Sequence, residues 1–377
     1  MTTTAPRIRL ESIHIENFRG IDQLDLAFPE PVMADEPDVL VLGSANGGGK
    51  TSVLEACALA VSGLLLGDKL REHLMALTET DSALNDYLIH GRAHMASARA
   101  VFATEVPDRK KVATKFELHR SNWWELHSDE PRVLRDAWSK RVGGRWSASA
   151  QDKWLGSLLG YEPDPLLLPP LIFFHGYRKV AEGNPTIAKL ADTNSGARKA
   201  RRRTAKATFR NDDDAGLFKL EALRCLMGRS GLFETGAEDA ERVLSVLNRL
   251  MAMYAGGTIE KLRPADDGSI DLRVTPVDKN RSSFTFDALS SGQKEIISTL
   301  FLIWLHTDKQ PGIVLLDEPE LHLNAEWHTR FLRSLHELCP QNQYIIATHS
   351  RTIFESVPPQ KRVLLEPSLP GSVEPSV

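Results

Sequence analysis

A glycine-rich segment near the N-terminus has the residue types and spacing needed to hold a phosphate. Residues 43–51 read Gly-Ser-Ala-Asn-Gly-Gly-Gly-Lys-Thr, between an apolar run at 39–42 and helix-forming residues at 52–61. Glycines let backbone N–H groups approach phosphates, the lysine reaches the β- and γ-phosphates, and the threonine hydroxyl binds Mg²⁺. We therefore predict a strand, a loop and a helix whose N-terminus faces a bound nucleotide. The expected binding residues are Asn46, Gly47, Gly48, Gly49, Lys50, Thr51 and Ser52.

A second apolar run, far along the chain, ends in a pair of acids. Residues 313–316 read Ile-Val-Leu-Leu, and Asp317 and Glu318 follow. In nucleotide hydrolases with a phosphate-binding loop, such an acid holds Mg²⁺, and a second acid can orient and polarise the attacking water. We predict that Asp317 and Thr51 hold the metal and that Glu318 is catalytic. The alternative is a strand followed by a structural Asp-Glu-Pro turn.

Residues 289–293, Leu-Ser-Ser-Gly-Gln, resemble the signature motif of ABC-type ATPases. In that family, the signature of one subunit closes over ATP that the other subunit holds. The resemblance therefore implies ATP and Mg²⁺ as cofactors and a homodimer formed through ATP. Ser291 stands where the family motif has its first glycine. The residues that the resemblance assigns to the partner's ATP are Ser290, Ser291, Gly292 and Gln293.

A third apolar run, residues 344–347, ends in Thr-His-Ser. His349 matches the switch histidine of ABC-type ATPases, which contacts the γ-phosphate, so the resemblance implies a second catalytic residue. A lone histidine at a strand end is otherwise usually structural. Residues 170–178 resemble the strand and loop that precede the helical lobe in related proteins. A glutamine is common in the Q-loop of ABC enzymes, and we find none here.

Residues 317–327 resemble the OLD/RecF-like branch of the ABC superfamily, whose bacterial members typically read Asp-Glu-x-Glu-x-His-Leu-His-Pro-x-Trp. This chain has Asn324 and Ala325 in place of the His-Pro pair. Residues 8–20 resemble the start of SMC-, RecF- and OLD-like heads, in which the residue matching Arg19 lies near the nucleotide. OLD enzymes continue into a Toprim nuclease, and we expect none here because few residues follow the histidine motif.

The same sequence indicates the elements that must position these motifs. The resemblance implies an α/β fold, namely a P-loop NTPase of the ABC-head type with a flanking antiparallel β-layer and a helical lobe that carries the signature. Residues 98–106, 112–118 and 123–127 read as strands of that layer, 215–254 as helical, and 258–274 as a hairpin. We expect a single head over residues 1–377. Its segments are 1–66 with the N-terminal strands and phosphate loop, 67–165 as a β-rich insertion, 166–285 as the helical lobe with a basic loop, and 286–377 with the signature, acids and switch histidine.

The composition limits the partners and the location. The formal net charge is -4, so any contact with nucleic acid must be local rather than a general attraction. Three scattered cysteines without metal-site spacing suit a reducing compartment. The sequence shows no secretory signal and no apolar stretch long enough to span a bilayer. We therefore expect a cytoplasmic protein without a membrane contact.

Two features in the middle of the chain are candidate contact surfaces. The basic run at 198–210 is either a contact to a phosphate backbone or a solvated loop that pairs with the acidic run at 212–214. Five tryptophans between residues 123 and 154 would suit stacking on bases, although a sheet-edge core or a protein interface is the stronger interpretation. The candidate nucleic-acid residues are Arg198, Lys199, Arg201, Arg202, Arg203, Lys206 and Arg210.

These motifs favour a Mg-dependent ATPase that sandwiches ATP between two subunits. ATP binding and hydrolysis would be coupled to DNA sensing or to control of a separate effector, a nuclease or a toxin, in bacterial defence or genome maintenance. The chain resembles stand-alone ATPases of defence systems such as Septu and the retrons. A RecF-like repair or replication clamp is the alternative. An ATPase subunit of a membrane transporter is less favoured, because residues 17–19 and 320–323 are not transporter-like.

Overall fold

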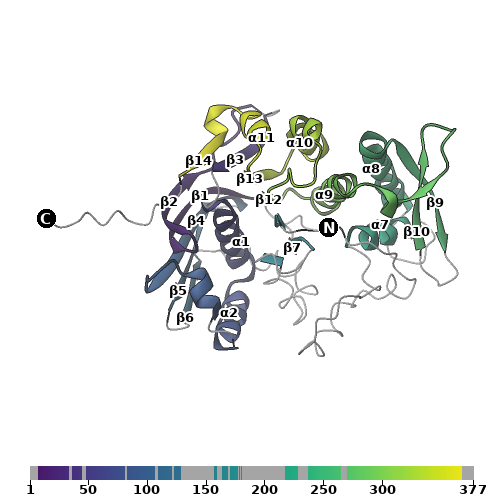
Figure 1. Cartoon of the computed structure of the whole chain (residues 1–377). Helices are drawn as coiled ribbons and strands as arrows, with labels where there is room; N and C mark the ends of the chain where they lie inside the picture. Colours follow the sequence, from purple (N-terminus) through teal and green to yellow (C-terminus); the bar gives the residue numbers. More distant parts are fainter. Residues whose placement is uncertain are drawn as a thin grey trace.

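The core of the computed structural model is a six-stranded sheet in the order β14-β3-β13-β12-β8-β7 (Figure 1). Its strands are β3 (Asp38–Ser44), β7 (Leu166–Leu168), β8 (Leu171–Phe174), β12 (Ile313–Asp317), β13 (Gln343–Thr348) and β14 (Arg362–Leu365). Neighbouring strands are parallel, except that β7 is antiparallel to β8. The structure describes residues 7–33, 36–44, 48–80, 83–106, 109–120, 123–128, 157–158, 164–168, 170–176, 178, 180, 217–227, 237–264 and 270–366.

The central strands of this sheet are continuous apolar runs because both of its faces are covered. Every residue of β12 and β13 is buried. The register pairs Asp317 with Ala347, and Ala347 with Leu42. The carboxyl ends of β3, β12 and β13 therefore meet at one edge, where open α/β sheets bind their ligands. The loops after these strands carry the glycine-rich, acidic and histidine motifs.

Helices cover the two faces of the core sheet. They are α1 (Lys50–Leu66), α9 (Ser291–Thr307), α10 (Ala325–Leu338) and α11 (Arg351–Glu355). Alternate strand residues point to opposite faces. Leu315 and Ile345 pack into the cluster that contains α1, whereas Val314 and Ile346 pack into the cluster that contains α9. The helix after the glycine-rich loop and the helix after the signature motif thus lie on opposite faces of one sheet.

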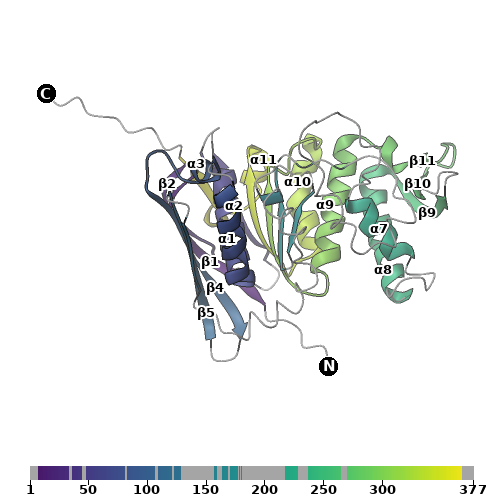
Figure 2. The same cartoon turned by 90° about the horizontal axis from the view of Figure 1, so that it is seen from below.

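An antiparallel sheet in the order β2-β1-β4-β5-β6 packs on the other side of α1. Its strands are β1 (Ile8–Phe18), β2 (Ile21–Ala27), β4 (Met95–Val106), β5 (Arg109–His119) and β6 (Trp123–Ser128). Figure 2 shows α1 between this sheet and the core sheet. The three strands expected for the flanking layer are confirmed as parts of β4, β5 and β6.

The segment expected as a β-rich insertion, 67–165, begins instead with two helices. They are α2 (Asp68–Thr80) and α3 (Ala83–Leu88). Leu70 and Leu74 recur at helical spacing and are buried in the same cluster as α1 and the antiparallel sheet. This spacing of apolar residues is the local signal for α2, and the β-rich description of the segment was too simple.

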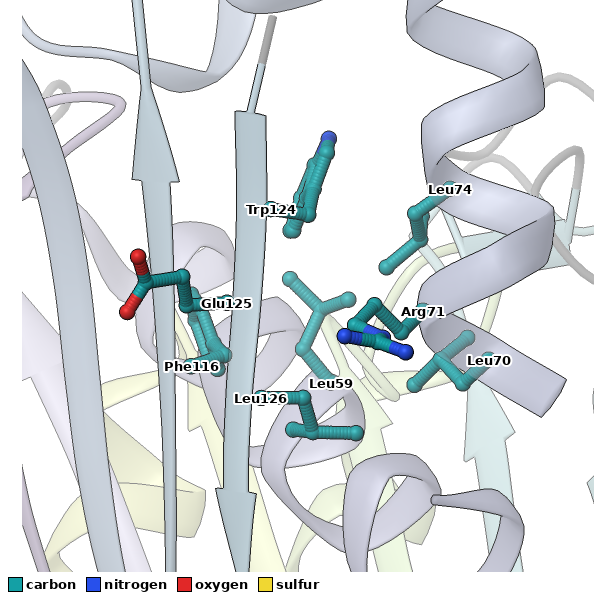
Figure 3. A pocket seen from close by; sticks show the side chains of 8 residues that line it. All are labelled: Leu59, Leu70, Arg71, Leu74, Phe116, Trp124, Glu125 and Leu126. Carbon is teal, nitrogen blue, oxygen red and sulfur yellow. The ribbon is translucent and has the colours of Figure 1, made fainter. Parts of the chain in front are cut away.

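Trp124 belongs to the core of the antiparallel sheet. It is 2% exposed and packs on Phe116, with 6.4 Å between the ring centroids. A pocket of about 10 Å³ remains beside it, between β6 and α2, with room for about one water molecule (Figure 3). At Trp124 the structure therefore supports the sheet-core interpretation over base stacking. Trp138, Trp146 and Trp154 lie outside the described residues.

A helical lobe lies at the end of the molecule opposite the antiparallel sheet (Figure 1). It contains α7 (Leu217–Met227), α8 (Ala237–Ala255), β9 (Gly257–Pro264), β10 (Ile270–Pro276) and β11 (Phe284–Thr285). The expected helices and the expected hairpin are confirmed. Segment 166–285 also supplies β7 and β8 to the core sheet, so it is not purely a helical lobe. Within the described parts of the chain, no helix has both the length and the apolar character needed to span a bilayer.

Candidate active site

The glycine-rich loop connects the end of β3 to the start of α1. Gly49 precedes the helix with φ of 76°, a left-handed conformation that favours glycine. A Cβ atom on Gly48 would lie 2.5 Å from the Ser44 side chain, so this position also requires glycine. Ser52 is buried in the first turn of α1. The remaining expected loop residues, Asn46 and Gly47, lie outside the described residues.

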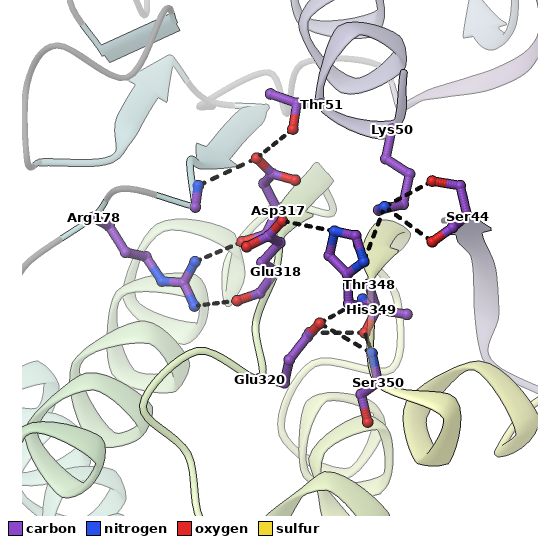
Figure 4. Close-up of polar contacts among 11 residues, drawn as sticks. Ser44, Lys50, Thr51, Arg178, Asp317, Glu318, Glu320, Thr348, His349 and Ser350 are labelled. Carbon is purple, nitrogen blue, oxygen red and sulfur yellow. Dashed lines mark hydrogen bonds and ion pairs between the residues drawn. The ribbon is translucent and has the colours of Figure 1, made fainter. Parts of the chain in front are cut away.

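The Lys50 ammonium lies in a polar cluster where the three loops meet (Figure 4). It donates a hydrogen bond of 2.8 Å to Ser44 Oγ and lies 3.5 Å from His349 Nδ1. Burial lowers the pKa of Lys50, whereas the charges of Glu318, Asp317 and Glu320 raise it. Ser44, which replaces the first glycine of the strict loop pattern, thus holds the lysine beside the acids.

The structure brings the two expected metal ligands together. Thr51 Oγ1 donates to Asp317 Oδ2 at 3.0 Å, and the backbone N–H of Gly176 donates to the same oxygen at 3.3 Å. The other oxygen, Asp317 Oδ1, is buried without a hydrogen-bond partner. Burial raises the pKa of Asp317 to about 6. A buried carboxylate with a free oxygen beside a hydroxyl fits Mg²⁺, which prefers oxygen ligands.

Glu318 and His349, the expected catalytic pair, are in direct contact. Glu318 Oε1 lies 3.1 Å from His349 Nε2, so the imidazole stands between Glu318 and Lys50 (Figure 4). Glu318 has φ of 46°, which is unusual for a residue with a side chain. Its backbone N–H bonds to the Ala347 carbonyl at 2.8 Å. Such uncommon backbone geometry occurs often at functional sites, where the surrounding structure holds it in place.

Arg178 is a site residue to which the sequence motifs assigned no role. This buried guanidinium donates to the Asp317 carbonyl at 2.7 Å and to the Glu318 carbonyl at 3.4 Å. It also pairs with Glu295 of α9 at 2.6 Å. Arg178 therefore ties the backbone of the acidic motif to the helix that follows the signature. The sequence signals were an arginine shortly after an apolar run and the resemblance of residues 170–178 to the strand and loop that precede a helical lobe.

Glu320 is a second residue without an assigned role. Its carboxylate accepts hydrogen bonds from Thr348, at the end of β13, and from His349 and Ser350, in the loop that follows (Figure 4). Glu320 is the third acid of the sequence Asp-Glu-Pro-Glu, which the sequence alone shows. Its partners lie about 30 residues further on, however, and only the pairing of β12 with β13 brings them near.

Arg19 lies in the turn between β1 and β2, beside the glycine-rich loop. Both Asn17 and Arg19 have φ of 51°, and a Cβ atom on Gly49 would be 3.8 Å from the Gly20 carbonyl. The Arg19 guanidinium pairs with the fully buried Glu55 of α1 and stacks over the Tyr87 ring at 4.3 Å. The turn thus lies next to the loop, in line with the position that the resemblance implied.

The signature residues form the N-terminus of α9. Ser290 Oγ accepts from the Gln293 N–H at 3.3 Å, and the Gln293 side chain accepts from the Ser290 N–H at 3.0 Å. This reciprocal capping box fixes the start of the helix. Gly292 approaches the loop after the acids so closely that a Cβ atom would lie 2.1 Å from the His322 carbonyl. Ser290 and Ser291 are exposed.

The basic run at 198–210 lies outside the described residues, as does the acidic run at 212–214. All seven candidate nucleic-acid residues fall in that region. Their role stays a prediction.

Two protein-family profiles match this chain. Residues 12–123 match "AAA domain", and residues 229–355 match "AAA domain, putative AbiEii toxin, Type IV TA system". The first match contains the glycine-rich loop, β2, β4, β5 and part of β1. The second contains the signature, the acids and the histidine. The profiles therefore cover both halves of the candidate site.

Curated relatives and a solved structure agree with these matches. "Retron Ec83 probable ATPase" of Escherichia coli is 22% identical over 96% of this chain and 72% of its own length. "Retron Vc95 probable ATPase" of Vibrio cholerae serotype O1 biovar El Tor is 30% identical over 26% of this chain and 21% of its own length. The crystal structure of an "SmcHead bound to the C-winged helix domain of ScpA" matches with a TM-score of 0.52 and 14% identity, over 92% of this chain and 91% of that one. The chain thus matches AAA-domain profiles in both halves of the candidate site, has an SMC-head-like, ABC-type fold and resembles the retron probable ATPases.

Proposed function

We propose that this protein hydrolyses ATP with Mg²⁺ at the site built from the loops after β3, β12 and β13. The observation that carries the proposal is the convergence of Lys50, Asp317, Glu318 and His349 within hydrogen-bonding or ion-pair contact of one another or of Thr51. A cation, an acid that can hold Mg²⁺ and a second acid that can orient water are groups that phosphoryl transfer to water uses.

Each residue has a separate role in this mechanism. Lys50 binds the β- and γ-phosphates, and Thr51 and Asp317 hold Mg²⁺. When bound, Mg²⁺ neutralises negative charge on the phosphates. Glu318 orients the attacking water and accepts its proton. His349, which contacts both Glu318 and Lys50, senses the γ-phosphate.

The proposal includes a homodimer in which the signature of each subunit closes the site of the other. The exposed Ser290 and Ser291 at the N-terminus of α9 support this arrangement, because a helix N-terminus favours an anionic ligand. Gly292 and Gln293 would act mainly by shaping that N-terminus. ATP would then hold the dimer closed, and hydrolysis would release it.

The proposed output is control of a separate effector, a nuclease or a toxin, or sensing of DNA. The relatives named as retron probable ATPases support a role in bacterial defence. The seven basic residues between 198 and 210 support a local contact with a nucleic-acid backbone. A negative net charge gives no general attraction that would replace this contact.

The test of hydrolysis is Glu318→Gln. We expect this variant to bind ATP and Mg²⁺ but to turn over on the order of 100-fold more slowly, because it keeps the metal ligands and loses the base. Steady-state turnover and nucleotide retention on a desalting column would measure the two effects. Glu326→Gln, an exposed acid at the start of α10, is the matched control and should behave as wild type. Near-normal turnover of Glu318→Gln would remove Glu318 from its role.

A further inference from the structure

Three hydrogen-bond donors converge on the Glu320 carboxylate (Figure 4). Oε2 accepts from Thr348 Oγ1 at 2.7 Å. Oε1 accepts from the backbone N–H groups of His349 at 2.5 Å and of Ser350 at 3.1 Å. The Thr348 hydroxyl also accepts from Ser350 N–H at 2.9 Å, so the four groups form one closed network. Bonds to a carboxylate are about twice as strong as bonds between neutral groups.

The turn that contains Glu318 and Glu320 therefore contacts His349 at two points, the imidazole ring and the backbone N–H. The Glu318 side chain contacts the imidazole at 3.1 Å, and the Glu320 side chain binds the backbone N–H of the same residue. The turn is closed by the Leu321 N–H, which donates to the Glu318 carbonyl at 3.1 Å. A change in the Glu320 contact can therefore shift the imidazole relative to the Glu318 carboxylate, because the backbone of His349 carries its ring.

We propose that Glu320 is a positioning residue for ATP hydrolysis, which sets the distance and orientation of His349 relative to Glu318 and Lys50. The inference rests on the roles given to Glu318 and His349 in the proposed function. It adds a residue whose carboxylate accepts hydrogen bonds from Thr348, His349 and Ser350. Displacing a catalytic group by about 1 Å can lower a rate about 100-fold, so a contact of this kind affects turnover more than binding.

Two substitutions at Glu320 test this inference through kinetics. Glu320→Ala removes all three contacts, and we expect kcat to fall roughly 10- to 100-fold while KM for ATP stays within about threefold. Glu320→Gln keeps one acceptor oxygen for the two backbone N–H groups, so we expect a smaller loss. Glu355→Gln is the matched control, because this exposed acid of α11 pairs with Arg351 in the same helix.

A double-mutant cycle with His349→Ala separates positioning from a general structural effect. If Glu320 acts through His349, adding Glu320→Ala to His349→Ala should change kcat by less than about threefold. Equal losses in both backgrounds would overturn the inference. If the wild type is active and the two substitutions lower kcat independently, only the role of Glu320 is contradicted. If the wild type shows no Mg-dependent hydrolysis, the proposed function itself is contradicted.

Hydrogen exchange gives a readout that does not depend on activity. The amides of His349 and Ser350 should exchange faster in Glu320→Ala, while the amides of α9 keep their protection. Glu355→Gln should leave both regions unchanged. Unaltered protection at residues 349 and 350 would overturn the inference even with reduced turnover. Global loss of protection would mean that Glu320→Ala unfolds the chain. The exchange of the amides of residues 349 and 350 would then be compared with that of α9 in Glu320→Gln.

Discussion

Asp317 stands at the end of a strand that is buried at every residue, so its charge is held where solvation is poor. Desolvation is the largest cause that raises its pKa, from an ordinary value of 3.8 to about 6, and the Thr51 hydroxyl opposes it. An ionised carboxylate in such a place lowers the stability of the fold. The site thus keeps an acid that the fold alone would not favour, as expected for a metal ligand.

Asp317→Asn should therefore stabilise the protein in the absence of Mg²⁺ and nucleotide. The stabilising contribution of a neutral Asp317 is complete below pH 3.8 and disappears as the pH rises through about 6. Above pH 7 the ionised group costs at most about 3 kcal/mol. In the asparagine variant the amide group takes the place of Oδ1, and its unpaired N–H offsets part of the stabilisation. We therefore expect the free energy of unfolding to rise by roughly 1–2 kcal/mol at pH 8 and not at pH 4. Urea unfolding in EDTA measures the gain, and a loss of stability at pH 8 would contradict it.

At the scale of elements, the motifs were predictable because each is local. A strand, a glycine-rich turn and a helix are encoded within residues 39–61, and the acids and the histidine directly follow buried runs. Arg178 and Glu320 were not predictable in the same way. Arg178 binds a carbonyl 139 residues away, which depends on β8 lying beside β12. Strand order in a parallel sheet arises from packing of the whole chain, so no local pattern indicates it.

The basic segment is the element that should supply nucleic-acid affinity. We expect Arg201, Arg202 and Arg203, replaced together by alanine, to weaken binding to all DNA sequences, because phosphate contacts carry no sequence information. Each lost contact should lower the slope of log affinity against log salt by about one unit. Fluorescence anisotropy over a salt series measures both effects, and ATP turnover without DNA should stay unchanged. Equal affinity at low salt would instead favour a protein partner for this segment.

At the scale of the whole molecule, the proposed mechanism places the two halves of an ATP site on different helices of one chain. Lys50 begins α1 on one face of the core sheet, and the signature begins α9 on the other. Arg178 and the close approach of Gly292 to the His322 carbonyl join the signature helix to the acidic loop of the same subunit. In a sandwich dimer, closure of the signature on one ATP would therefore change the position of the acids that act on the other ATP.

Two inactive variants should restore activity when mixed if each site is shared between subunits. Lys50→Ala removes the phosphate contact, and Ser290→Arg blocks the signature, so each homodimer should be inactive. Random exchange makes about half of the dimers mixed, each with one intact site of two, so about a quarter of wild-type turnover should return. A mixture of Lys50→Ala with the double variant carrying both changes is the control, because it contains no intact site. Thermal unfolding and light scattering would establish that each variant is folded and dimeric. With that established, a mixture as inactive as its components would mean that each subunit completes its own site.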